Sequence, residues 1–167
     1  QTQGGGGQIF KGDYGAVKIA AKQVFSASRS SVEDRSEFNN EVQMLVALSH
    51  PNILQCFGVS QGHDGSLYQI LEFCAGGTLH KHALENDTDF TVEEFCRVIR
   101  ETLAGVVFLH ERHISHRDLK PENLLLLDAQ NRRVKIAGRK WMVGNTTGDA
   151  VVVCGSCPSV SSRPWNN

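Results

Sequence analysis

The polar run at residues 116–123, His-Arg-Asp-Leu-Lys-Pro-Glu-Asn, holds the side chains best suited to chemistry. Asp118 supplies a carboxylate, Lys120 a cation and Asn123 an amide in close succession. Such groups can accept a proton, stabilise an anion and offer an oxygen ligand to a metal ion. Because the run lies between a predicted helix and an apolar segment, we interpret it as a catalytic loop.

The same run resembles the catalytic loop of eukaryotic protein kinases, because all of its fixed positions agree with that signature. Phosphoryl transfer needs a carboxylate that orients the attacking hydroxyl, a cation near the moving phosphoryl group and an oxygen ligand for Mg²⁺. The resemblance implies that Asp118 is the base, Lys120 the phosphate-side cation and Asn123 a metal ligand. A lysine two residues after the aspartate is more similar to Ser/Thr kinases than to Tyr kinases.

Two upstream residues lie at distances that the resemblance requires. Lys22 ends the run Ile-Ala-Ala-Lys, which resembles the strand that carries the lysine of the ATP site. Glu41 stands where the family's helix supplies the ion-pair partner of that lysine. Either residue alone would be ordinary, since such side chains are usually solvated. With the catalytic loop downstream, both join the predicted catalytic residues.

Residues 71–77, Leu-Glu-Phe-Cys-Ala-Gly-Gly, resemble the gatekeeper and hinge of the family. The resemblance implies that Leu71, Glu72 and Cys74 bind the nucleotide, with a backbone amide and carbonyl of the hinge reading the adenine edge. Ala20 and Leu125 match the apolar positions above and below the adenine ring. The alternative for residues 71–77 is an ordinary strand and loop.

The four glycines at residues 4–7 allow two interpretations. Aligning Phe-Lys-Gly at 10–12 on the motif that follows the kinase phosphate-binding loop puts Gly4 and Gly7 on its second and third glycines, but Thr2 on the first. Gly4, Gly7 and Ile9 are therefore predicted to bind the nucleotide. A glycine run is also typical of a flexible linker.

The chain departs from the family after Val-Lys-Ile-Ala at 134–137. The family continues with Asp-Phe-Gly, whereas this chain has Gly138 followed by Arg139 and Lys140. The principal carboxylate for Mg²⁺ is absent, so Mg²⁺ binding is expected to be weakened. Losing one preorganised electrostatic group commonly costs roughly 10²–10³ in rate.

Several elements must position these residues. A helix is expected from residue 31, because Val42, Leu45 and Leu48 repeat on one face until His-Pro ends it. Apolar runs at 53–60 and 67–74 predict an antiparallel hairpin, and runs at 124–127 and 134–137 predict a second one. Residues 138–167 are expected to be irregular.

Thr91 and Glu94 form a capping-box pattern that predicts the start of a long helix. Its apolar spacing predicts one inward stripe. The stripe comprises Phe95, Val98, Ile99, Thr102, Val106 and Leu109. The large-lobe helices that cover this face in kinases have no counterpart in the sequence, so part of the face is expected to be exposed.

Composition restricts the class of protein. The chain has 167 residues, 40% of them hydrophobic, with a formal net charge of −1. These values predict one globular domain or part of one, and they argue against a nucleic-acid-binding module, which needs a basic surface. The apolar runs are too short to span a bilayer, and we find no signal-peptide pattern. Five irregularly spaced cysteines favour reduced thiols. We therefore expect a cytoplasmic or nuclear protein without membrane insertion.

These observations predict an α+β, bilobal protein-kinase-like fold that is truncated. Residues 1–140 are expected to form a partial kinase domain, and residues 141–167 an irregular tail without family resemblance. Within the domain, the expected divisions are a small lobe at about 1–74, a hinge at 72–77 and the start of a large lobe at 78–140.

The resemblance implies a protein Ser/Thr kinase that transfers the γ-phosphate of ATP, with Mg²⁺, to protein substrates in signalling. Residues 37–54 loosely resemble the tyrosine-kinase-like group of these enzymes. The alternative is a pseudokinase-like module that binds nucleotide or a partner without turnover. The missing carboxylate favours this alternative, and the intact catalytic loop opposes it.

Overall fold

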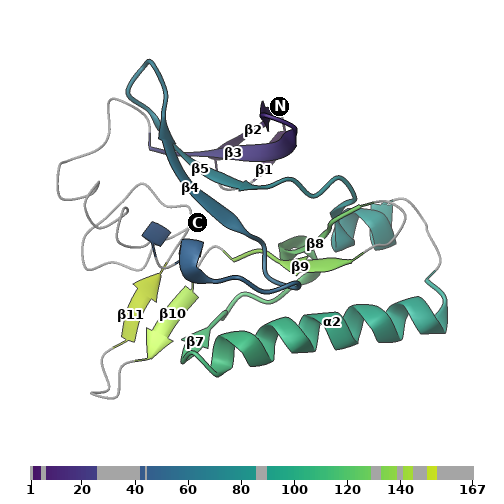
Figure 1. Ribbon diagram of the computed structural model, residues 1–167. Helices are drawn as coiled ribbons and strands as arrows, with labels where there is room; N and C mark the ends of the chain where they lie inside the picture. Colours follow the sequence, from purple (N-terminus) through teal and green to yellow (C-terminus); the bar gives the residue numbers. More distant parts are fainter. Residues whose placement is uncertain are drawn as a thin grey trace.

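The computed structural model describes the backbone of residues 2–4, 7–25, 42–43, 45–85, 90–128, 133–138, 141–144 and 150–153. Figure 1 shows that a five-stranded sheet lies on one side of the described structure and the long helix α2 (Val92–His110) on the opposite side. The short strands β8 (Leu124–Leu126) and β9 (Val134–Ile136) lie between them. The arrangement agrees with the α+β class expected from the sequence.

The five-stranded sheet is antiparallel throughout. Its strands, in spatial order, are β1 (Thr2–Gly4), β2 (Gly7–Tyr14), β3 (Val17–Phe25), β5 (Leu67–Glu72) and β4 (Cys56–Gln61). The hairpin predicted from two apolar runs is confirmed as the β4–β5 pair. The turn between β2 and β3 contains Gly15 at φ +59°, a conformation that glycine adopts without steric cost.

Strand β3 brings four predicted nucleotide-binding residues to one face of this sheet. Lys22 lies opposite Ile9 of β2 and opposite Gln69 of β5, and Ala20 lies opposite Leu71. Directly opposed residues of antiparallel strands share a face, as do residues two apart along a strand. Ile9, Ala20, Lys22 and Leu71 therefore share one face.

Helix α2 begins at the predicted capping box. The Glu94 amide donates to Thr91 Oγ1 at 3.2 Å, and the Thr91 amide donates to Glu94 Oε2 at 3.0 Å. These reciprocal bonds satisfy two amides that otherwise lack partners at a helix start. The buried residues of α2 are Val98, Thr102, Gly105 and Leu109.

The predicted inward stripe of α2 is wrong at Phe95 and Ile99, whose side chains are 57% and 43% exposed. They belong to an outward apolar stripe that also contains Val92, Leu103 and Val107. Because α2 has apolar residues on two faces, a period of 3.6 does not decide which of them packs. The expectation that an apolar face of this helix is partly exposed is confirmed.

The second predicted hairpin is confirmed as β8 (Leu124–Leu126) and β9 (Val134–Ile136), with β6 (Gly77–Thr78) pairing on the far side of β8. Strand β9 also bonds to residues 52–54. The Ile136 amide donates to the Asn52 carbonyl at 2.8 Å, and the Leu54 amide donates to the Ile136 carbonyl at 2.9 Å. Strand β9 therefore joins the segment that precedes β4 to the hairpin that follows the catalytic loop.

A third sheet contains β7 (Ile114–Ser115), β10 (Trp141–Gly144) and β11 (Ala150–Val153), with β10 in the middle. The prediction that 138–167 is irregular is wrong for β10 and β11. Local sequence does not reveal this pairing, because β10 is hydrogen-bonded to a two-residue strand that is distant along the chain.

The hydrophobic core runs from the five-stranded sheet to α2. Its most buried members include Val42, Ile53, Leu109, Val134 and Ile136. Residues 42–43 and 45–47 are helical, and Val42, Leu45 and Leu48 are buried, as the expected helix from residue 31 requires. The earlier part of that helix lies outside the described residues.

Gly105 marks the closest approach between α2 and the rest of the core. A Cβ at this position would lie 2.6 Å from Ile136 Cδ1 and 3.0 Å from the Asn52 carbonyl oxygen. Alanine normally stabilises a helix by about 1 kcal/mol relative to glycine, but overpacking costs typically 1–3 kcal/mol. Ile136 is fully buried, so its side chain would have to shift within the packed core to admit the added methyl group.

We therefore expect Gly105→Ala to lower the midpoint of thermal unfolding by roughly 2–6 °C. The control is Leu103→Ala, a truncation of an exposed side chain on the same helix, which should change the midpoint little. An unchanged or higher midpoint for Gly105→Ala would show that α2 is not packed tightly against β9.

Candidate active site

The loop of residues 116–123 runs from β7 to β8 and ends in one helical turn, η2 (Pro121–Asn123). At its start the Asp118 amide donates to the His116 carbonyl at 2.9 Å, and Arg117 between them has φ +57°. A left-handed non-glycine residue costs roughly 1–2 kcal/mol. Strain of this kind persists where the surrounding structure fixes the backbone.

The Asp118 carboxylate is held between two donors. Lys120 Nζ lies 3.0 Å from Oδ1, and Asn123 Nδ2 donates to Oδ2 at 2.9 Å. Burial acts to raise the pKa of Asp118, but the hydrogen bonds from Lys120 and Asn123 outweigh it and lower the pKa below 3.8. Asp118 is therefore an oriented, ionised carboxylate at neutral pH.

Asn123 is buried and braces the loop from inside. Besides the Asp118 carboxylate, its Nδ2 donates to the Asp118 carbonyl at 2.6 Å. Since both bonds use the amide nitrogen, Oδ1 is the atom that could serve as a ligand for a cation.

His116 connects the loop to the end of β9. Its Nε2 lies 3.0 Å from the Ala137 carbonyl, and its Nδ1 is 3.3 Å from the Asp118 amide. The Ala137 amide in turn donates to the Asn123 carbonyl at 2.8 Å. A neutral ring that is protonated on Nε2 satisfies both of these contacts.

The predicted hinge is attached by backbone bonds to β8 and to the residue that follows this strand. The Ala75 amide donates to the Leu127 carbonyl at 2.9 Å, and the Gly76 amide donates to the Leu126 carbonyl at 3.0 Å. A Cβ on Gly76 would lie 2.6 Å from Leu126 Cβ, so this approach requires glycine. Within the described part of the chain, the Cys74 amide has no acceptor, and its role in binding adenine stays a prediction.

The Cys74 side chain is half-buried beside this amide. Burial, followed by the neighbouring Glu72 carboxylate, raises the pKa of the Cys74 thiol to about 12. The thiol is therefore neutral at physiological pH, which argues against nucleophilic chemistry at this position.

The structure brings the other predicted nucleotide-binding residues to two places. Gly4 and Gly7 are register partners that close the β1–β2 hairpin, which continues into the strand that carries Ile9. Leu125 lies in β8, next to the hinge attachment. Lys22 is buried on β3. Glu41 lies outside the described residues, so its pairing with Lys22 stays a prediction.

The residues around Asn123 provide few ligands for Mg²⁺. This ion prefers six oxygen ligands and usually takes carboxylates, phosphates and water. Gly138, next to Ala137, has no side chain, and the described residues contain no group of three acidic, histidine or cysteine side chains that could hold a metal ion. The expectation that Mg²⁺ binding is weakened stays a prediction.

Sequence reasoning missed three polar residues around β9, of which Asn52 and Lys135 are buried. Glu101 Oε2 accepts from the Val134 amide at 2.7 Å, Asn52 Nδ2 donates to the Val134 carbonyl at 3.0 Å, and Lys135 Nζ lies 2.9 Å from Glu72 Oε2. The available signal was a lysine within the apolar run Val-Lys-Ile, since a strand so short and apolar is usually buried on both faces.

Comparison with known proteins assigns the chain to a family. The protein kinase domain matches residues 3–138. An Aurora kinase from Encephalitozoon cuniculi is 30% identical over 149 residues, which are 89% of this chain and 54% of that protein. Aurora kinase A-A from Xenopus laevis is 32% identical over 139 residues, 83% of this chain and 33% of that protein. Human serine/threonine-protein kinase ULK3 is 37% identical over 123 residues, 73% of this chain and 24% of that protein.

The chain belongs to the protein kinase domain family. It spans about half, or less, of the length of the curated relatives that it matches. The resemblance read from the catalytic loop and the predicted protein-kinase-like fold are thereby confirmed. The family as a whole uses ATP and Mg²⁺. Among the described residues, no helix is long and apolar enough to cross a membrane.

The buried ring of His116 should make the stability of the chain depend on pH. Burial lowers the pKa of His116 below its ordinary 6.5, although the Ala137 carbonyl and Asp118 oppose the shift. Between the lowered folded value and 6.5 the unfolded chain binds more protons, so the free energy of unfolding falls as the pH decreases through this window.

We expect chemical denaturation to show lower stability at about pH 5.5 than at about pH 7.5 and a smaller difference in His116→Gln. Some dependence should remain in the variant, because burial, Lys135 and Arg112 also lower the pKa of His50. Equal pH dependence in the two proteins would contradict a neutral, buried His116.

Proposed function

We propose that the chain carries the nucleotide-binding part and the catalytic loop of a protein Ser/Thr kinase, which transfers the γ-phosphate of ATP to hydroxyls of protein substrates in signalling. The observation that carries the proposal is the Asp118 carboxylate, fixed by Lys120 at 3.0 Å and Asn123 at 2.9 Å. An ionised carboxylate on a braced loop is what orientation of an attacking hydroxyl needs.

The nucleotide would lie between the five-stranded sheet and β8. The adenine ring would contact Ala20 and Leu125, while the Cys74 amide and the Glu72 carbonyl face its edge. Lys22 is on the same sheet face as Ala20 and would bind the α- and β-phosphates, with Glu41 as its proposed partner. This side chain would neutralise phosphate charge.

In the proposed reaction the substrate hydroxyl oxygen bonds to the γ-phosphorus as the bond from phosphorus to the β-phosphate oxygen breaks, giving ADP. The hydroxyl proton passes to Asp118, and Lys120 stabilises charge on the transferred group. Ser/Thr specificity is proposed from Lys120, two residues after the aspartate, and from relatives with Ser/Thr kinase names.

The proposed domain extends over 1–140, with a small lobe at 1–74, a hinge at 72–77 and the start of a large lobe at 78–140. A cytoplasmic or nuclear location is also a proposal. The second candidate function is a pseudokinase-like module that binds nucleotide or a partner without turnover. Gly138 favours it, because the chain has no carboxylate at the position of the family's metal-binding aspartate.

A radiometric assay with ATP, Mg²⁺ and a general protein substrate tests the first proposal on the full chain. We expect weak transfer by the wild type and background transfer by Asp118→Asn, which keeps the shape of the side chain but not its charge. Gly138→Asp should raise transfer by roughly 10²–10³, the usual contribution of one preorganised electrostatic group.

Thermal unfolding of the same proteins separates the two candidates. Nucleotide at 100 times its dissociation constant adds about 2.7 kcal/mol, or roughly 5–10 °C for a chain of this size. Such a shift without any transfer above Asp118→Asn, even after Gly138→Asp, would favour the pseudokinase-like module. Absence of both the shift and transfer would overturn the first candidate and the nucleotide-binding form of the second.

A further inference from the structure

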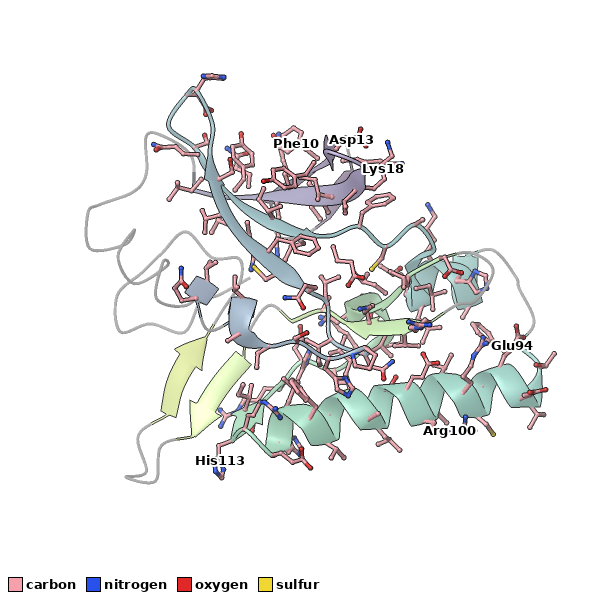
Figure 2. All side chains as sticks on the ribbon, viewed as in Figure 1. Phe10, Asp13, Lys18, Glu94, Arg100 and His113 are labelled. Atoms are coloured by element: carbon pink, nitrogen blue, oxygen red, sulfur yellow. The ribbon has the colours of Figure 1, made fainter. Side chains whose placement is uncertain are left out.

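A buried ion pair joins strand β9 to the start of the hinge. Lys135 is 7% exposed, and its Nζ lies 2.9 Å from Glu72 Oε2. A buried ammonium group is costly unless it is paired, and removing one partner of such a pair is strongly unfavourable. The pair therefore fixes both side chains in one arrangement. In contrast, the Lys18–Asp13 pair between β2 and β3, labelled in Figure 2, is mostly exposed.

The two paired side chains lie beside the proposed adenine site, to which Glu72 contributes only its backbone carbonyl. Lys135 is the register partner of Leu125 in the β8–β9 hairpin, so the two side chains share a face. Glu72 is the last residue of β5 and follows Leu71 directly. The ion pair thus connects the strand under the proposed adenine position with the segment that leads to Cys74.

The backbone of Glu72 is fixed at the same point. Its amide donates to the Gln55 carbonyl at 2.9 Å, and its carboxylate accepts from the Gln55 amide at 3.4 Å. Farther along, the Ala75 amide is bonded to the Leu127 carbonyl. The short stretch that contains Cys74 is therefore anchored at both ends, with its free amide between the anchors.

We propose that Lys135 is a positioning residue for adenine recognition. By holding the Glu72 side chain, it fixes the direction of the Glu72 carbonyl and the Cys74 amide before the nucleotide arrives. Preformed hydrogen-bonding groups lower the ordering cost of binding. This inference rests on the proposed function, and it gives a role to a residue that does not touch the nucleotide.

Selectivity between adenosine and inosine is the direct readout. Adenosine presents an amino donor to the Glu72 carbonyl, whereas inosine presents an oxygen at the same position and would be repelled. A general loss of stability weakens binding of both nucleosides, but a displaced hinge backbone changes their ratio. Dissociation constants of both are measured by calorimetry on the full chain and on each variant.

We expect the wild type to prefer adenosine and Lys135→Met to reduce the preference roughly tenfold. Lys135→Arg keeps the cation and should keep most of the preference. Glu72→Gln keeps the shape of the partner, removes its charge and should behave as Lys135→Met, which provides a second reading if Lys135→Met does not fold. Lys18→Met removes the exposed pair and should change nothing.

An unchanged ratio in both Lys135→Met and Glu72→Gln, or a parallel loss of both nucleosides, would overturn the positioning role and leave the proposed function standing. A wild type that binds adenosine no better than inosine would overturn the inference. A wild type that binds neither would overturn the proposed function as well.

Discussion

The arrangement of the site depends on the hydrogen bond between the Glu101 carboxylate and the Val134 amide. From α2 the carboxylate accepts the Val134 amide at 2.7 Å, and it lies 3.5 Å from the side-chain amide of Asn52, which also bonds the Val134 carbonyl. A hydrogen bond to a charged group contributes about 1.5–3 kcal/mol. This junction fixes β9 relative to both the long helix and the segment before β4, and β9 in turn carries Lys135 and leads to Ala137.

From this junction, order extends into the catalytic loop through the backbone. The Ala137 carbonyl is hydrogen-bonded to the His116 ring, and the Ala137 amide donates to the Asn123 carbonyl. The Asn123 side chain in turn donates to the Asp118 carboxylate. The loop is therefore shaped by contacts outside the reacting groups. Gly138 replaces a proposed metal ligand of the family without removing any of these bonds, so the geometry of the loop does not depend on that ligand.

Local patterns in the sequence predicted the parts of the structure that depend on local physics. The Thr91 capping box and the two hairpins are fixed by neighbouring residues and were predicted correctly, and the spacing of the catalytic loop led to the right family. The packed face of α2 was not predictable, because Phe95, Ile99 and Val98 are all apolar. Only the segments that pack against the helix decide which of them is buried. The role of Glu101 likewise depends on a partner 33 positions away in the sequence.

The half-buried thiol of Cys74 could be used to measure how fast the hinge opens. Burial and the Glu72 carboxylate raise the pKa of this thiol to about 12, so very little of it is ionised at neutral pH. Since the thiolate is the form that reacts with alkylating reagents, modification of Cys74 should be slow in this arrangement and faster when the hinge opens. Cys96 on α2 is exposed and would give the reference rate within the same molecule. The ratio of the two rates would measure hinge opening as a kinetic quantity.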